Sequence, residues 1–90
     1  MVKLRIRSMA KVQNIVGPQI RKLRYQQNLT QEQLAARCGI RGWDISRATL
    51  SKIEAQIRCV NDSELEVLAD ALGVKMDILF PPRSKSGKSR

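Results

Sequence analysis

Two short apolar stripes with helical spacing, separated by a loop, occupy the segment Gln31 to Ala55 and restrict what this chain can fold into. The first stripe ends at Gly39, and the second begins near Ile45 and runs to about Gln56. Residues at such intervals fall on one face of a helix, so each stripe predicts a helix with one buried side. The two helices are expected to meet at an angle over a shared core that contains Leu34, Ala35, Cys38, Ile45, Leu50 and Ile53.

The outward positions of the second stripe carry side chains that are either small or able to form hydrogen bonds. A helix that lies in a DNA major groove requires such side chains, whereas a helix that faces solvent more often carries Glu. We therefore predict that this helix faces DNA bases with Arg47, Ala48, Ser51 and Lys52.

Three motifs of the chain carry a family resemblance. They are TQEQLA at Thr30 to Ala35, SRATLSKIE at Ser46 to Glu54 and LEVLADALGVKMDILF at Leu65 to Phe80. They resemble the first motif helix, the recognition helix and the last two helices of the phage-repressor family. This is the lambda-repressor and Cro type that also includes the xenobiotic-response-element regulators of bacteria. The likeness covers residues 17 to 80, and the chain departs from the family in its longer loop, Ile40 to Asp44.

The resemblance implies an all-α fold, a five-helix lambda-repressor-like DNA-binding domain with an extended loop between the two helix-turn-helix helices. Arg47 corresponds to a base-reading position of the family. Its guanidinium suits bidentate contact with guanine O6 and N7, and contact with phosphate is the alternative. Ala48 offers only a methyl group, for instance to thymine, while Lys52 suits guanine or phosphate.

Contacts with the DNA backbone would orient the helices without reading sequence. Gln31 matches a phosphate-binding position of the family and can place its amide and the helix N-terminus against a phosphate; a merely polar helix start is the alternative. The long loop brings Arg41 and Trp43 within reach of the backbone, or else Trp43 folds back to cover the core. The complete set of predicted backbone contacts is Gln31, Arg41, Ser46, Thr49 and Arg58.

The length and composition favour one small helical domain. A chain of 90 residues can bury a modest core, and 42% hydrophobic with only 3% aromatic residues suits a helical bundle better than a sheet. The net charge of +9 is unevenly placed: residues 17 to 58 carry eight basic and three acidic side chains, and residues 59 to 82 carry one basic and five acidic. One end of the domain is therefore expected to face polyanions.

Local signals indicate the helix boundaries of a domain over residues 17 to 82. Pro18 suits the first position of a helix that runs to about Gln27, with Arg21, Lys22 and Arg24 on its outer face. Two pairs are typical of a capping box, and a glycine suits the end of the fourth helix. These signals are Thr30 with Gln33, Asn61 with Glu64, and Gly73.

Both termini are basic and are assigned outside this domain. Residues 1 to 16 form a basic arm, or a short strand that pairs with a second copy, since Val2, Leu4 and Ile6 alternate with basic residues. Residues 83 to 90 lack apolar side chains and are predicted to be disordered.

The segment Val74 to Phe80 predicts a short last helix that Pro81 and Pro82 stop. Its apolar side chains surround the helix almost entirely, which is more than one core-facing side can bury. The same region often forms the dimer contact in related repressors, so a homodimer interface is predicted here; closure of the bundle is the alternative. The interface residues would be Val74, Met76, Ile78, Leu79 and Phe80.

Several other classes of protein find little support. The two cysteines form no C-x-x-C pair and the chain has no His to complete a zinc site, so a buried Cys38 thiol is expected, with a disulfide as the minor alternative. No nucleophile and base can be placed together, so neither an enzyme nor a cofactor is expected. The chain has no run long enough for a membrane span and no secretory signal, which favours a cytoplasmic protein.

These features predict a sequence-specific regulator that binds double-stranded DNA, most simply a repressor that binds a palindromic operator as a homodimer. The alternative is an antitoxin or co-regulator that acts mainly through a protein partner gripping the apolar last helix.

Overall fold

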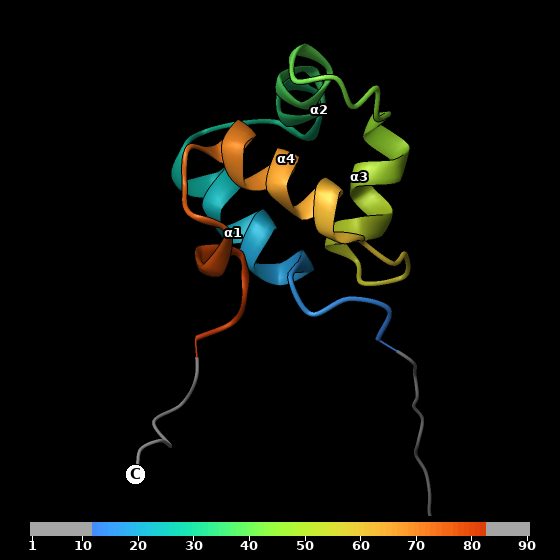
Figure 1. Ribbon diagram of the computed structural model, residues 1–90, viewed down its shortest axis with the longest axis vertical. Coiled ribbons are helices and arrows are strands. Elements are labelled where there is room, and N and C mark those ends of the chain that lie inside the picture. Colours follow the sequence, from blue (N-terminus) through green and yellow to red (C-terminus); the bar gives the residue numbers. More distant parts are fainter. Residues whose placement is uncertain (1–11, 83–90) are drawn as a thin grey trace, which may run out of the picture.

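The structure, a computed structural model, describes residues 12–82 and contains only helices within that range (Figure 1). Four α-helices precede one 3-10 helix: α1 Gly17–Gln26, α2 Gln31–Ile40, α3 Arg47–Glu54, α4 Asp62–Leu72 and η2 Met76–Leu79. α2 packs against α3 and α4, while α1 packs against α3 and η2. The predicted all-α fold with a loop between α2 and α3 is confirmed. None of the helices in residues 12–82 has the length and apolar character needed to cross a membrane.

One apolar core lies between these helices and receives side chains from each of them. Burying a large aliphatic side chain stabilises a fold by about 1.5–3 kcal/mol, so a few such residues decide the packing. Trp43, in the loop before α3, is half-buried and packs against this core, which confirms that it folds back as a cover. The fully buried side chains are Ile20, Leu34, Cys38, Leu50, Ile53, Leu68 and Leu79.

Side-chain caps begin three of the helices, and those of α2 and α4 lie where the sequence indicates. Thr30 accepts a hydrogen bond from the Gln33 amide at 3.0 Å, and the Gln33 side chain accepts one from the Thr30 amide at 2.8 Å. Asn61 and Glu64 form the same capping box at α4, and Ser46 caps α3 by accepting from the Thr49 amide. Each such cap contributes on the order of 1 kcal/mol. The positive φ of 71° at Gly73 ends α4 as predicted.

The last element differs from the predicted α-helix. Residues Met76–Leu79 form a 3-10 helix of four residues, and no side chain caps its start at Lys75. Leu79 is fully buried in the core, so its assignment to a dimer interface is wrong: it closes the bundle. Three apolar neighbours remain 37–43% exposed, namely Met76, Ile78 and Phe80.

The domain begins earlier than residue 17, the boundary that the sequence indicates. Val16 belongs to the core, and Asn14 links the start of α1 to the end of α3. Its side-chain oxygen accepts from the amides of Val16 and Gly17, and its side-chain nitrogen donates to the carbonyls of Ile53 and Arg58 at 3.1 and 2.8 Å. The chain consequently enters the fold beside the C-terminal end of α3 (Figure 1). The predicted arm over residues 1–11 and the tail over 83–90 lie outside the described residues.

The two cysteines are free and differ in exposure, as expected for Cys38: it is buried, whereas Cys59 is exposed. Burial raises the pKa of the Cys38 thiol to about 11, so little reactive thiolate forms at neutral pH. We expect iodoacetamide at pH 8 to add one group to the folded protein, at Cys59, and two in denaturant, as read by intact mass. Cys59→Ser should abolish the folded-state adduct. Rapid double labelling of the folded protein would contradict the burial of Cys38.

Candidate nucleic-acid interface

The polar face of α3 lies on the surface, opposite the residues that anchor the helix. Leu50 and Ile53 are fully buried, which fixes one side of α3 in the core. The other side carries the predicted base-contact residues: Arg47, Ala48 and Lys52 are exposed and Ser51 is half-buried. The helix therefore offers two cations, a hydroxyl and a methyl group from a rigid support, the mixture that reads base edges in a major groove. Of the backbone-contact candidates on this helix, Ser46 is exposed and Thr49 half-buried.

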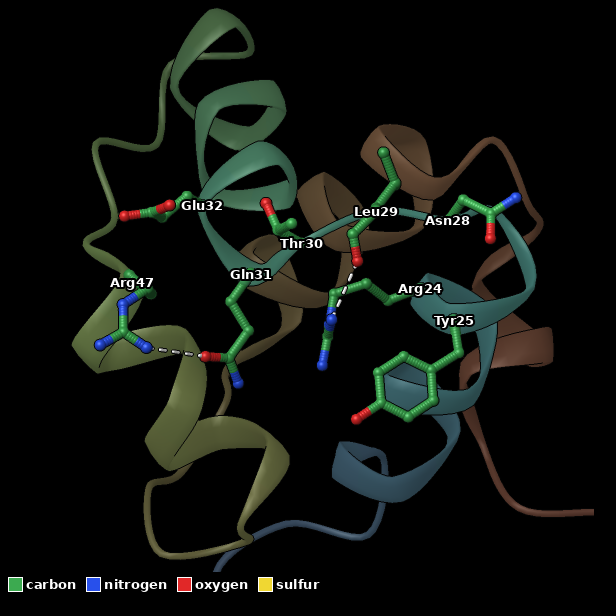
Figure 2. Close-up of a pocket in the computed structure, with 8 residues that line it drawn as sticks. All are labelled: Arg24, Tyr25, Asn28, Leu29, Thr30, Gln31, Glu32 and Arg47. Carbon is green, nitrogen blue, oxygen red and sulfur yellow. Dashed lines mark hydrogen bonds between the residues drawn. The ribbon is translucent and has the colours of Figure 1, made fainter.

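Gln31, at the first turn of α2, lies between this face and the core (Figure 2). Its side-chain oxygen accepts from Arg47 Nη1 at 3.3 Å, and its side-chain nitrogen donates to Glu54 Oε1 at 3.1 Å. The structure thus brings together Gln31 and Arg47, which the sequence assigns to backbone and base contact, respectively. The amide groups at the start of α2 add partial positive charge beside them.

A buried ion pair connects α1 to α3 beneath this surface. Arg24 Nε and Nη2 donate to the two carboxylate oxygens of Glu54 at 2.7 and 2.9 Å, and Arg24 Nη1 donates to the Leu29 carbonyl at 2.9 Å. The hydrogen-bonded Glu54 holds the pKa of Arg24 above its ordinary value despite burial. Glu54 therefore has a structural role as the partner of a buried arginine.

The same pair corrects the placement of Arg24 on the outer face of α1, because Arg24 is buried while Arg21 and Lys22 are exposed. The spacing of apolar residues along α1 contains a signal for the burial of Arg24. Position 24 follows Ile20 by four residues and therefore falls on the apolar stripe of α1.

A groove of about 940 Å³ opens where α1 ends and α2 and α3 begin (Figure 2). Its walls include two residues that sequence reasoning did not select. The exposed Tyr25 has its ring 4.7 Å below the Arg24 guanidinium carbon, and Asn28 turns the chain with a φ of 57°. The groove also contains Gln31 and Arg47, so a phosphate placed there would meet the N-terminus of α2 and hydrogen-bond donors. Glu32 is the acidic member of the lining.

Arg41 and Arg58, the two remaining predicted backbone contacts, are both paired with acids of α4. Arg41 Nε lies 2.6 Å from Asp70, and Arg58 Nη2 lies 3.1 Å from Glu64. Contact with DNA by either residue stays a prediction, and each guanidinium would have to share its charge with the carboxylate it already holds.

The Arg58 contact makes stability depend on pH through Glu64. The hydrogen bonds that Glu64 accepts from Arg58 hold the pKa of Glu64 below its ordinary value, although partial burial acts in the opposite direction. A lowered pKa stabilises the folded state at pH values above the ordinary pKa of a glutamate, about 4.3. This stabilisation is lost as the pH falls through the folded-state pKa. We expect the difference in urea midpoint between wild type and Glu64→Gln to shrink from pH 7 to pH 3. An equal difference at both pH values would contradict the ion pair.

Comparisons with known proteins agree with this geometry. A helix-turn-helix family model matches residues 20–79. A restriction-modification controller protein, C.AhdI from Aeromonas hydrophila, is similar in structure with a TM-score of 0.65 and 31% identity, over 72% of this chain and 87% of that one. A hypothetical transcription factor, NHTF from Neisseria, has a TM-score of 0.66 and 29% identity, over 79% of this chain and 75% of that one. No protein of curated function matches the chain significantly.

Proposed function

Since this chain belongs to the helix-turn-helix family of DNA-binding transcription regulators, we propose that it represses transcription by binding a palindromic operator as a homodimer. The mechanism is occupancy: a two-fold dimer places one α3 helix in each of two major grooves about 34 Å apart and covers a promoter. The observation that carries the proposal is the surface of α3, where Arg47 stands exposed beside the N-terminus of α2.

The distribution of charge supports this docking direction. Residues 17–58, which include α1, α2 and α3, have eight basic and three acidic side chains, while residues 59–82 have one basic and five acidic. DNA repels the acidic side chains of α4, so the protein approaches with α2 and α3 forward. Contacts to phosphates then supply affinity that falls steeply with salt.

The proposed contacts divide into reading and orienting groups. On α3, Arg47 and Lys52 donate to guanine, while Ala48 and Ser51 contact neighbouring base edges. Gln31, Ser46 and Thr49 donate to phosphates, and we add Tyr25 from the wall of the groove to this orienting group. Each good bidentate base contact is worth about 1–3 kcal/mol of discrimination, so Arg47 carries much of the sequence preference.

The proposed dimer contact is the exposed apolar surface around η2. Met76, Ile78 and Phe80 remain 37–43% exposed after the fold has closed, and Val74 is half-buried beside them. A second copy would remove this apolar surface from water. A different protein could cover the same residues, which is how the chain would act as an antitoxin or co-regulator.

Selection from a pool of random duplexes, followed by sedimentation of the complex, tests this function. We expect a palindromic site with two half-sites and two chains bound per site. Ile78→Asp should weaken dimerisation and operator binding, whereas Ile40→Asp, at an 82% exposed position on α2, should leave the oligomeric state unchanged. Absence of an enriched site would contradict sequence-specific binding, and a monomer at each half-site would contradict the homodimer.

A further inference from the structure

The two segments that flank α3 meet each other on the side of the domain formed by α4. Trp43 lies in the loop that leads into α3, and Arg58 lies in the connection that leaves it. The guanidinium carbon of Arg58 stands 5.8 Å from the centre of the Trp43 ring, within the range of a cation-π contact. The entry and the exit of the helix are therefore joined by one side-chain contact.

The N-terminal turn of α4 holds Arg58 in this position. Arg58 Nη1 and Nη2 donate to the two Glu64 carboxylate oxygens, each at 3.1 Å, and Nη1 also donates to the Cys59 carbonyl at 2.9 Å. Glu64 is itself fixed, because it accepts from the Asn61 amide in the capping box of α4. The contact thus extends from Trp43 through Arg58 to the rigid start of α4, and we name these three residues the clasp.

The loop that the clasp holds is also supported by Arg41, whose Nε lies 2.6 Å from Asp70 of α4. α2 ends at Ile40 and α3 begins at Arg47, so the connection is longer than the three- or four-residue turn typical of the motif. Its backbone is tied to α2 through Trp43 N and the Cys38 carbonyl at 3.0 Å, and Ile45 enters the core. A surface pocket of about 290 Å³ lies beside Trp43 and is lined by Gly42, Glu64 and Val67 among others.

We propose that the clasp of Trp43, Arg58 and Glu64 positions α3 and thereby sets how strongly the protein discriminates between DNA sequences. This inference rests on the proposed function and assigns the three residues a positioning role rather than a contact with bases. Support of this kind matters because a base-reading side chain must be held within about 0.5 Å of its productive geometry by supporting residues.

Phosphate attraction does not require the same precision, because charge acts over about 10 Å in ordinary salt. Opening the clasp should therefore reduce affinity for the selected site while affinity for random duplex persists. The opposite pattern belongs to a phosphate contact, whose loss weakens binding to all sequences and lowers the dependence on salt.

Glu64→Gln is the variant that separates these roles. Glutamine keeps an oxygen that can accept from the Asn61 amide, so the capping box survives, while the ion pair with Arg58 is lost. Glu66→Gln is the matched control: it makes the same change of charge on the same helix, at an exposed residue with no ion pair within residues 12–82. Both variants are compared with wild type on the selected operator and on random duplex at two salt concentrations.

We expect Glu64→Gln to lower the ratio of operator to random-duplex affinity about tenfold, the scale of one misplaced base contact, and Glu66→Gln to leave it unchanged. We expect Trp43→Leu to lower this ratio by a similar factor. Trp43→Phe should keep the ratio near the wild-type value, since an aromatic face remains for Arg58. Circular dichroism at the assay temperature confirms that each variant is folded.

Three results would overturn the proposal in distinguishable ways. If the wild type selects a site and Glu64→Gln leaves the ratio unchanged, the positioning role of the clasp is contradicted and the proposed function stands. Tighter binding to every duplex with a steeper salt dependence would show that releasing Arg58 supplies a phosphate contact instead. A wild type that selects no site would remove the proposed function and the positioning role together.

Discussion

Gly17→Ala is expected to lower the free energy of unfolding by about 3 kcal/mol, the upper end of the usual cost of overpacking. Gly17 opens α1 directly against the last turn of α3. A Cβ atom at this position would lie 2.3 Å from the Ile53 carbonyl oxygen and 2.8 Å from that of Glu54. Both neighbours are backbone atoms, so relief requires the two helices to separate. Urea unfolding followed by circular dichroism measures the loss.

Gly39→Ala is the matched control and should change stability in the opposite direction. Gly39 lies within α2, and a Cβ atom there would meet nothing within 4 Å. Replacing a helical glycine by alanine stabilises by roughly 0.5–1 kcal/mol, because alanine loses less backbone entropy on folding. Equal effects at the two positions would contradict the close approach of α1 to α3.

Glu54→Ala is expected to destabilise the protein by about 3–5 kcal/mol, because it leaves the buried Arg24 charge without its partner. Arg24 is only 7% exposed and directs two donors at the lost carboxylate. Gln31 loses the acceptor of its side-chain nitrogen in the same variant. The urea midpoint at pH 7 gives the change in stability, provided that the slope of the transition stays constant.

The double variant Arg24→Met with Glu54→Leu shows whether the cost arises from the unpaired charge. Apolar residues of similar volume often replace a buried ion pair without loss, so the double variant should recover most of the stability lost in Glu54→Ala. A double variant as unstable as the single one would mean that the lost interaction is packing around Glu54. Retained stability in Glu54→Ala would contradict the buried pair itself.

The helix boundaries are predictable from the sequence because the signals that set them are local. Thr30 with Gln33 and Asn61 with Glu64 lie three residues apart, and each pair satisfies the amide groups of its own helix start. The glycine after α4 needs only its own backbone conformation. The α3 surface is predictable for a similar reason, since one helix places Arg47 and Lys52 on the face opposite its apolar stripe.

The features that sequence reasoning misses depend on residues far apart in the chain. In the sequence Arg24 resembles its cationic neighbours, because the Glu54 that pairs with it lies thirty positions later on α3. Asn14 falls within the predicted terminal arm, but its side chain donates a hydrogen bond to the Ile53 carbonyl, thirty-nine positions later. Leu79 is assigned to a dimer surface because composition alone does not tell which apolar side chain of a short segment turns inward.

The clasp is another set of contacts, close to the candidate interface, between residues that are far apart in the sequence. A single Trp in a long loop predicts either a cover for the core or a contact with DNA, and the core packing of Trp43 decides for the cover. That Arg58 stacks on it while holding Glu64 requires three separate segments to be placed together. Sequence spacing carries no information about that meeting.

The central claim is that Arg47 reads sequence from the surface of α3. The most direct test is the ratio of affinities for the selected operator and for random duplex, measured side by side for wild type, Arg47→Ala and Lys22→Ala. Lys22 is an exposed cation on α1, so its loss makes the same change of charge outside α3 and outside the proposed dimer contact. We expect Arg47→Ala to lower the ratio by about 5- to 150-fold, the equivalent of 1–3 kcal/mol, and Lys22→Ala to leave it unchanged. An equal ratio in all three proteins would contradict sequence reading through Arg47.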